Sequence, residues 1–362
     1  MTLAPTITEL LARARADFRM GVPIVITKAG RGALAVPVET LDGSRLADFA
    51  AIGHPVLAIT ARRAETLKAR SYDGDIARIA LPDGADLDWI GALADPSGDL
   101  RSPMKGPLSS VREGDAALHR AAILLAKEAR LLPAVLVVDL PEPAAFAKEH
   151  QLTVIDIDQA NPILSALSPL HSVVSAQLPL EVSENSRLHV FRPEDGAEEH
   201  YAIEIGRPDR DKPVLTRLHS ACFTGDLLGS LKCDCGPQLR AALRKMGDER
   251  AGVLLYLNQE GRGIGLANKM RAYSLQDQGF DTVEANHRLG FEDDERDFRI
   301  GAGILQKMGF DSVRLLTNNP AKVRMMEANG ISVVERVPLQ VGLNPLNAKY
   351  LDTKAKKSGH IL

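Results

Sequence analysis

Three cysteines lie close together in the sequence and could hold a metal ion. Ten residues separate Cys222 from Cys233, and one residue separates Cys233 from Cys235. Zinc prefers four tetrahedral ligands, so three thiolates leave one position for a water whose pKa the metal would lower toward neutrality. Two alternatives are weaker: Cys-Asp-Cys followed by Gly-Pro is unsuited to a buried strand, and Cys233 and Cys235 are too close to bridge comfortably. The stretch therefore predicts a catalytic zinc site.

Two further stretches have the residue types of a phosphate-binding turn. QEGRGIGL (259–266) follows a predicted strand, and its three glycines would let the backbone approach an anion at the start of the next helix. It does not complete the dinucleotide pattern G-x-G-x-x-G, which needs glycine in place of Leu266. TNNPAKV (317–323) opens another predicted helix and supplies Lys322. An ordinary strand-to-helix turn remains the alternative for both.

Length and charge narrow the class of protein. The chain has 362 residues, which predicts two domains, and 45% of them are hydrophobic, enough for two cores. A formal net charge of −3 argues against a nucleic-acid polymer as partner. No apolar run is long enough to span a membrane, and the N-terminus lacks the apolar core and cleavage site of a signal peptide. Three thiols without an export signal favour the cytoplasm.

The predicted elements indicate an α/β (α+β) fold in two domains. The first 170 residues alternate predicted helices and strands, although residues 72–112 show few periodic runs. Residues 171–216 predict an antiparallel meander of three strands, after which strands and helices alternate again. Residues 284–298 favour a solvated loop by composition. The predicted organisation is residues 1–170, residues 171–348 and a polar tail, 349–362.

The second half resembles the GTP cyclohydrolase II family, whose zinc enzyme opens the guanine ring at the start of riboflavin synthesis. The similarity runs from about residue 173 to the C-terminus. Its motifs stand in the family's order and spacing: HSxCxTGDxxGSxxCDCGPQL, QEGRGIGL, DTVEAN, DERDF, RLLTNNPxK and ERVPL. The resemblance therefore implies a mixed α/β catalytic domain with an antiparallel meander.

The resemblance also implies a role for individual residues. Cys222, Cys233 and Cys235 would hold the zinc. Tyr273 would assist ring opening, Asp294 would accept a proton, and Arg296 is the family's proposed nucleophile toward the α-phosphate. A guanidinium stays protonated and is a poor nucleophile, so stabilising phosphate charge is the easier task for Arg296. The residues implied to bind GTP are Arg217, Leu218, His219, Ser220, Ala221, Gln238, Glu260, Gly261, Arg262, Thr282, Thr317 and Lys322.

The reaction that the family implies is the hydrolysis of GTP to 2,5-diamino-6-(5-phosphoribosylamino)pyrimidin-4-one, formate and diphosphate. Hydroxide activated by zinc would attack the guanine carbon between the two imidazole nitrogens, and a second hydrolysis would release that carbon as formate. Mg²⁺ is expected to accompany the triphosphate and neutralise its charge. The resemblance also implies a homodimer.

Two positions depart from the family's usual residues. Ala221 stands where glutamate is usual, and Asn258 stands where arginine is usual. These two changes leave the zinc chemistry intact. They allow the alternative that the chain is a paralogue, which uses the same ring-opening chemistry on another nucleotide or a pyrimidine. A non-catalytic nucleotide sensor would have lost a zinc ligand or a catalytic residue, and none is lost.

The first half resembles, more weakly, the 3,4-dihydroxy-2-butanone 4-phosphate synthase domain that is often fused ahead of this enzyme. The likeness rests on RMGVPIVI, LPAVLVVDL and FAKEHQLTVIDI. The synthase binds magnesium through an acidic loop, but no acidic residue occurs between Asp17 and Glu39 in the corresponding TKAGRGALAV region. ALHRA stands where the synthase has its phosphate-binding element, GHTEA. His119 lies one position further along than the histidine of that element. We therefore expect a degenerate, inactive domain, with a bifunctional enzyme as the alternative.

Overall fold

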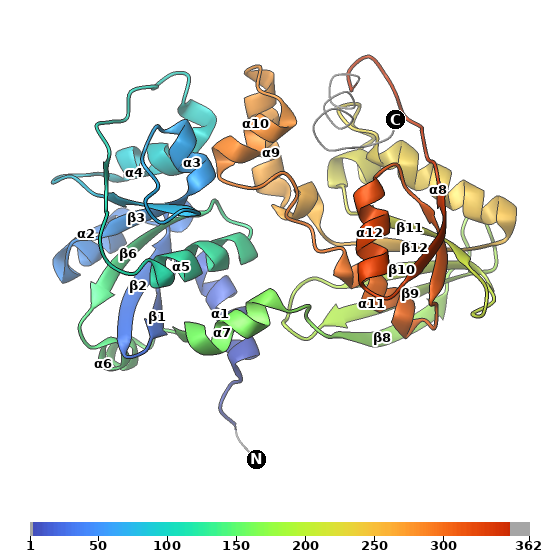
Figure 1. Cartoon of the computed structure of the whole chain (residues 1–362), viewed down its shortest axis with the longest axis horizontal. Helices are drawn as coiled ribbons and strands as arrows, with labels where there is room; N and C mark the ends of the chain where they lie inside the picture. Colours follow the sequence, from blue (N-terminus) through green and yellow to red (C-terminus); the bar gives the residue numbers. More distant parts are fainter. Residues whose placement is uncertain (1–2, 348–362) are drawn as a thin grey trace. The chain divides into compact units, whose positions relative to one another are not determined.

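The chain forms two compact units, each built on its own seven-stranded sheet (Figure 1). The computed structural model describes residues 3–347, so the predicted polar tail lies outside the described residues. Unit 1 comprises Met1–Ala166 and Ala267–Glu295, and unit 2 comprises Leu167–Leu266 and Arg296–Leu362. Two sheets, each covered by helices, confirm the predicted fold class. No helix among residues 3–347 is both long and apolar enough to cross a membrane.

The sheet of unit 1 is largely antiparallel. Its strands are β1 (Ile24–Lys28), β2 (Arg31–Pro37), β3 (Val56–Thr60), β4 (Ile76–Ala80), β5 (Ser109–Ser110), β6 (Ala134–Leu140) and β7 (Val154–Asp156). They lie in the order β5-β4-β3-β6-β2-β1-β7, and only β1 and β7 pair in parallel. Ala29 and Gly30 alone connect β1 to β2, with φ of 47° and 81°, as tight hairpins require. The TKAGRGALAV stretch, which corresponds to the synthase's acidic loop, is therefore part of a hairpin of two paired strands with a two-residue turn.

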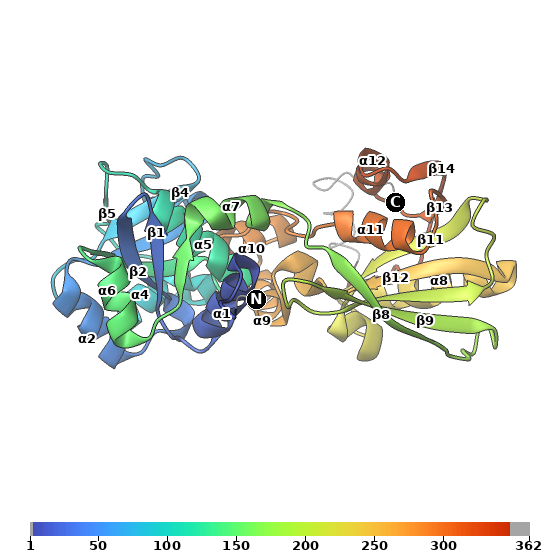
Figure 2. The same cartoon turned by 90° about the horizontal axis from the view of Figure 1, so that it is seen from below.

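Helices cover both faces of this sheet because its strands alternate between two apolar cores. The helices of unit 1 are α1 (Ile7–Arg19), α2 (Gly43–Ile52), α3 (Ala61–Thr66), α4 (Leu87–Ala94), α5 (Ala117–Glu128), α6 (Pro143–His150), α7 (Ile157–Ser165), α9 (Leu266–Asp277) and α10 (Thr282–Leu289), with 3-10 turns η1 (Val38–Thr40) and η2 (Pro96–Gly98). Ile24 and Ile26 pack in one core with α1, α5 and α7, whereas Val25 packs in the other with α2 and α6. Figure 2 shows these helices around the sheet. The period of two in β1 thus builds a three-layer unit.

Unit 2 joins a parallel half-sheet to an antiparallel meander. Its strands are β8 (Leu170–Gln177), β9 (Ser186–Pro193), β10 (His200–Gly206), β11 (Val214–Ser220), β12 (Ala251–Leu257), β13 (Ser312–Leu316) and β14 (Ser332–Val337), in the order β14-β13-β11-β12-β10-β9-β8. Strands β8 to β10 pair antiparallel, which confirms the predicted meander. Strands β11, β12, β13 and β14 run parallel. The carboxyl ends of parallel strands form the edge where ligands bind in open α/β sheets.

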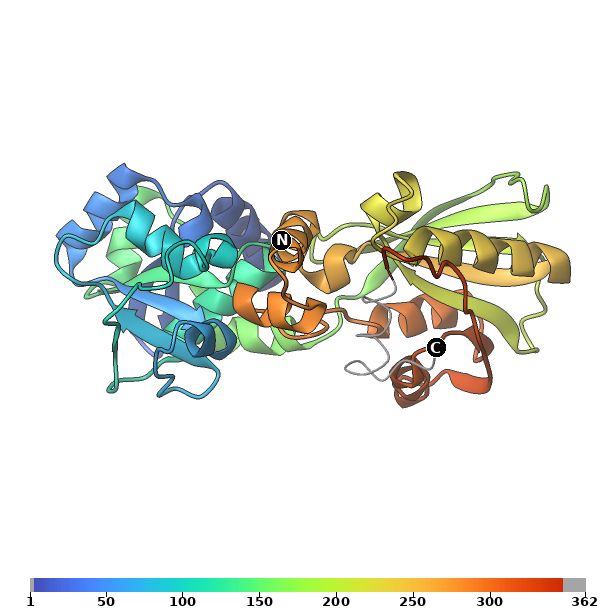
Figure 3. The same cartoon turned by 90° about the horizontal axis from the view of Figure 1, so that it is seen from above.

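The helices of unit 2 also lie on both faces of its sheet. They are α8 (Cys235–Glu249), α11 (Arg299–Lys307) and α12 (Pro320–Ala328), with the short helical turns η3 (Phe223–Leu227) and η4 (Glu260–Gly263). Leu254 packs in the core with α8, whereas Val253 and Leu255 pack with α11 and α12 (Figure 3, α8 in gold, α11 and α12 in red). The helices on the two faces therefore hold the carboxyl ends of β11, β12 and β13 in place.

Two stretches are more ordered than their composition indicates. Residues 72–112 contain β4 and α4, and β4 is buried along almost its whole length, so it lacks the alternation that marks a half-buried strand. The predicted solvated loop at 284–298 is wrong for its first six residues, which belong to α10. Asp281 and Glu284 form a capping box at the start of that helix, and Ala285 and Leu289 are buried.

A histidine is buried in unit 1. His119 on α5 is 8% exposed, and its Nδ1 atom finds no hydrogen-bond partner among the described residues. Burial and the nearby Arg78 cation lower the pKa of His119 from 6.5 to about 4. The carboxylates of Asp139, Asp73 and Asp115 act in the opposite direction but do not offset burial. The folded chain therefore keeps His119 neutral at pH values where the unfolded chain protonates it.

We predict that unit 1 loses stability as the pH falls from 7.5 to 5. The unfolded state binds a proton at His119 below pH 6.5, and the folded state does so only near its pKa of about 4. The free energy of unfolding should therefore fall by about 2 kcal/mol at pH 5 through this group. Urea unfolding followed by the fluorescence of Trp89, the one tryptophan, measures it. His119→Gln should remove this part of the pH dependence; an unchanged dependence would contradict the prediction.

Candidate metal centre

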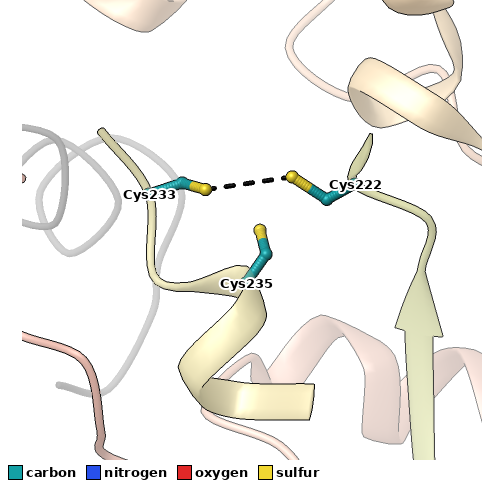
Figure 4. A group of neighbouring side chains, drawn as sticks. All are labelled: Cys222, Cys233 and Cys235. Atoms are coloured by element: carbon teal, nitrogen blue, oxygen red, sulfur yellow. Dashed lines mark hydrogen bonds between the residues drawn. The ribbon is translucent and has the colours of Figure 1, made fainter. Parts of the chain in front are cut away.

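The three cysteines converge at the carboxyl edge of the unit 2 sheet (Figure 4). Cys222 lies just beyond β11, Cys233 lies in the turn before α8, and Cys235 is the first residue of α8. Their Sγ atoms all lie within 4.8 Å of one another, and those of Cys222 and Cys233 are 3.8 Å apart. Cys222 and Cys233 are buried, and Cys235 is partly exposed.

The spacing of the thiols fits a tetrahedral metal. Zinc–sulfur bonds of about 2.3 Å at tetrahedral angles put sulfur atoms about 3.8 Å apart, whereas a disulfide needs about 2 Å. Gly225 keeps the space clear, because a Cβ there would lie 2.7 Å from the Sγ of Cys233 and 3.0 Å from that of Cys222. The contact with Cys222 and burial raise the pKa of the Cys233 thiol, and a bound cation would oppose that shift. The group can therefore hold a metal with three sulfur ligands.

A buried carboxylate orders the backbone around the first cysteine. Asp226 accepts a hydrogen bond from the backbone N–H of Cys222 at 3.0 Å and from the hydroxyl of Tyr256 at 3.0 Å. The Nε2 atom of His219 lies 3.0 Å from both of its oxygens. Burial lowers the pKa of His219, and burial next to the Asp226 carboxylate raises the pKa of Tyr256. Asp226 thus ties Cys222 to β11 and β12.

Sequence analysis did not single out Asp226 or Tyr256. Asp226 stands four residues after Cys222, within the TGD of the cysteine motif, which is close enough to turn back onto the Cys222 backbone. That spacing was an available signal. Tyr256 lies thirty positions further along, on a strand that reads as an ordinary apolar run.

A buried guanidinium lies at the same strand edge. Arg217 donates from Nη1 to the carbonyl of Leu316 at 2.9 Å and from Nη2 to Gln238, which itself donates to Asp234 at 2.6 Å. Burial lowers the pKa of Arg217 to about 10, so it remains charged at neutral pH. Its Nε–H finds no acceptor among the described residues. A buried donor without an acceptor is unfavourable, which favours an anion or a water here.

Two more cations are fixed beside this edge. Lys322 donates from Nζ to the carbonyl of Leu218 at 3.1 Å, and Arg296 donates from Nη1 to the hydroxyl of Ser220 at 3.2 Å. Both stand over the ring of Phe298, at 4.6 Å and 4.7 Å from its centroid. The three cations give this edge the charge that a phosphate requires.

The QEGRGIGL stretch forms a turn with left-handed backbone. Gly261 and Arg262 have φ of 64° and 61°, and two further glycines of the turn also have positive φ. Arg262 is in a conformation that is unfavourable for a side chain and is typical of functional sites. Glu260 accepts from the backbone N–H of Phe223 at 2.6 Å, which joins this turn to the cysteine loop. Gln259, which the sequence analysis did not select, is buried, and its Oε1 finds no donor within residues 3–347.

The structure divides the predicted site residues between the two units. Tyr273 on α9, Thr282 at the start of α10 and Asp294 after α10 belong to unit 1. Leu218 and His219 face inward, since Leu218 is in the apolar core and His219 contacts Asp226. Unit 2 contains the cysteines and Arg296 with Arg217, Leu218, His219, Ser220, Ala221, Gln238, Glu260, Gly261, Arg262, Thr317 and Lys322.

The site combines three thiols that could hold a metal ion with cations fixed at the same strand edge, an arrangement suited to a hydrolase. The chain belongs to the GTP cyclohydrolase II family. Residues 171–338 match the family's sequence model, whose description is GTP cyclohydrolase II. The GTP cyclohydrolase-2 of Azospirillum brasilense is 45% identical over 358 residues, which cover 96% of this chain and 93% of the relative.

Shorter relatives match about half of the chain. The GTP cyclohydrolase-2 of Azotobacter vinelandii is 59% identical over 175 residues, 48% of this chain and 84% of its own. That of Escherichia fergusonii is 60% identical over 164 residues, 45% of this chain and 83% of its own. A crystal structure of RibBX, a two-domain 3,4-dihydroxy-2-butanone 4-phosphate synthase from A. baumannii, aligns with a TM-score of 0.33 and 16% identity over 90% of this chain and 99% of that one. A score this low does not establish a shared fold.

We predict that Gly225→Ala abolishes metal binding. The added methyl would stand 2.7 Å from the Sγ of Cys233, so the thiols could no longer converge. Zinc measured by elemental analysis of the purified chain should fall from about one per chain to near zero. Gly303→Ala is the matched control, because its Cβ meets nothing closer than 3.7 Å. Full zinc content in Gly225→Ala would refute the geometry described for the site.

We predict that Asp226→Asn weakens the binding of zinc. An amide NH₂ cannot accept hydrogen bonds, so one of the three donors that face Asp226 would lose its acceptor and Cys222 would be held less firmly. Loss of such a supporting group typically costs about 10- to 100-fold in metal affinity. Competition with a chromogenic chelator measures the affinity. Tyr256→Phe, which removes one donor and keeps the carboxylate, should cost less; wild-type affinity in Asp226→Asn would show that the carboxylate is dispensable.

Proposed function

We propose that this chain is a zinc-dependent GTP cyclohydrolase II. It would hydrolyse GTP to 2,5-diamino-6-(5-phosphoribosylamino)pyrimidin-4-one, formate and diphosphate, the first step of riboflavin biosynthesis. The observation that carries the proposal is the convergence of three thiols with Arg217 and Lys322 at one strand edge. The name of the A. brasilense relative, which matches almost the whole chain, supports GTP as the substrate.

The metal and the nucleotide would be bound by residues that, apart from Thr282, belong to unit 2. Cys222, Cys233 and Cys235 would hold zinc, whose chemistry when bound is to lower the pKa of a water for attack on the guanine ring. Arg217 and Lys322, already fixed by backbone carbonyls, would bind the phosphates together with Mg²⁺. The remaining predicted contacts to GTP are Leu218, His219, Ser220, Ala221, Gln238, Glu260, Gly261, Arg262, Thr282 and Thr317, with Leu218 acting through its backbone.

Three residues would act on the reacting groups. Asp294 would accept a proton, and Tyr273 would assist the opening of the ring. Arg296 is held by Ser220 and Phe298, and its guanidinium is suited to stabilising charge at the α-phosphate. Asp294 and Tyr273 belong to unit 1, and Arg296 belongs to unit 2.

We assign the cyclohydrolase domain to residues 171–348 and a degenerate synthase-like domain to residues 1–170. The tight turn at Ala29 and Gly30 presents no carboxylate to a metal, which supports an inactive first half. By family, the chain would act as a homodimer on a small nucleotide and not on a nucleic-acid polymer.

A paralogue with another nucleotide or a pyrimidine as substrate is the second candidate. Ala221 has no polar side chain, and the Asn258 amide donates to the carbonyl of Glu199. Two positions where the family carries charged side chains therefore carry no charge here. This difference would change the choice of substrate and leave the zinc chemistry intact.

We predict that the purified chain with zinc, Mg²⁺ and GTP releases formate and the pyrimidine product in equal amounts. Cys233→Ser should lose both, because the metal would lose one of three sulfur ligands. Formate is measured enzymatically and the pyrimidine by chromatography. A chain that binds about one zinc yet leaves GTP intact would refute the proposed substrate and favour the paralogue, for which a panel of other nucleotides is the next assay.

A further inference from the structure

The segment that carries three of the predicted site residues packs with the first half of the chain. Residues 267–295 form one compact unit with residues 1–166, although motif order places them in the second half. Figure 1 shows this segment in orange as α9 and α10. Helix α10 contacts α3, and Leu275, Leu289 and Phe291 are buried within the segment. The first half therefore forms the packing surface of this segment.

The start of the segment is held by buried polar contacts. Asn268 is fully buried and donates to the carbonyl of Arg130 at 3.1 Å. Arg271 lies 3.0 Å from Glu39 and 3.3 Å from Asp95, both in the first half. The other oxygen of Glu39 accepts from a backbone N–H of the first half, so this carboxylate is itself fixed. Of Asn268 and Arg271, Arg271 lies within one helical turn of Tyr273 along α9.

The end of the segment is held by two ion pairs that flank Asp294. Arg62 contacts Glu292 at 2.8 Å, and its Nε lies 3.2 Å from both carboxylate oxygens. Lys127 contacts Glu295 at 2.6 Å. Both cations come from the first half, and Asp294 lies between their two partners in the sequence. The backbone position of Asp294 is thus set from both sides.

Close backbone packing also joins the segment to the first half. Gly290 has φ of 89°, and a Cβ there would lie 2.8 Å from Oγ1 of Thr60 and 2.9 Å from Cγ of Pro133. No side chain fits at this point, so the backbone itself makes the contact. A contact this close fixes the segment in a way that long, exposed side chains alone would not.

We propose that the first half of the chain is a positioning domain for the segment 267–295, and that Glu39, Arg62 and Lys127 are its positioning residues. These residues hold the segment in the conformation that catalysis needs, while the first half performs no chemistry of its own. The inference rests on the proposed function, which gives Tyr273 and Asp294 their roles. It assigns a task to a half of the chain that lacks the carboxylates of the synthase it resembles.

The test is the full-length triple variant Glu39→Gln, Arg62→Gln, Lys127→Gln. Three substitutions are combined because single partly exposed ion pairs contribute little. Two quantities are measured: deuterium uptake of peptides from residues 267–295, and the kcat and KM for GTP. We expect faster uptake in that segment and a fall in kcat on the order of tenfold, because small displacements of reacting groups are costly. Zinc content should not change.

Two further variants give the comparison. Arg31→Gln, Arg120→Gln, Glu128→Gln removes three ion pairs within the first half that do not involve the segment, and it should change neither uptake nor kcat. Glu39→Asp, Arg62→Lys, Lys127→Arg keeps the charges and should restore most of the kcat, which a general loss of stability would not predict.

Each outcome decides the inference. Unchanged uptake in residues 267–295, or faster uptake with an unchanged kcat, would overturn it. An equal fall in kcat in the control variant would also overturn it. If the wild-type chain releases no formate from GTP, the proposed function fails by itself. The uptake comparison then decides separately whether the first half holds the segment.

Discussion

The convergence of the three cysteines depends on a buried carboxylate beside the first of them. Three thiols from a strand end and a helix start must meet at one point, and their negative forms repel one another. A buried carboxylate is stable only when its oxygens accept hydrogen bonds. Asp226 meets this need with Cys222, His219 and Tyr256, and so orders the loop that carries the first thiol. Gly225, its neighbour, leaves the volume in which the thiols converge.

The cations at the same edge are held by the sheet itself. Arg217 and Lys322 donate to carbonyls of Leu316 and Leu218, at the ends of two adjacent parallel strands. Carbonyls reduce the cost of burying a cation without neutralising it, so the positive charge remains available to a ligand. Such groups need little reorganisation when an anion binds, which is the usual source of electrostatic catalysis. The parallel half of the sheet therefore holds both the three thiols that could bind a metal and the cations that could bind a phosphate.

Local patterns were sufficient to predict some features and not others. The cysteine spacing, the antiparallel meander and the helix that TNNPAKV opens follow from residues that are near one another in sequence. The structure shows the thiols together, the meander, and α12, which Asn319 caps. Asp226 was missed because its role depends on Tyr256 thirty positions away and on burial, which no short motif reports. Helix α10 was missed because its sequence is polar and few of its residues are buried.

The packing of residues 267–295 had no signal in the sequence. Motif order assigns these residues to the second half, and the ion pairs that tie them to the first half join residues 168 to 232 positions apart. A first half without a structural role would make only loose, exposed contacts with the segment. The buried amide of Asn268 and the close backbone contact at Gly290 instead require a defined fit. The A. brasilense relative matches both halves of the chain. The first half of the chain lacks the catalytic carboxylates of the synthase, but it has a structural role. It completes the unit that contains Tyr273 and Asp294.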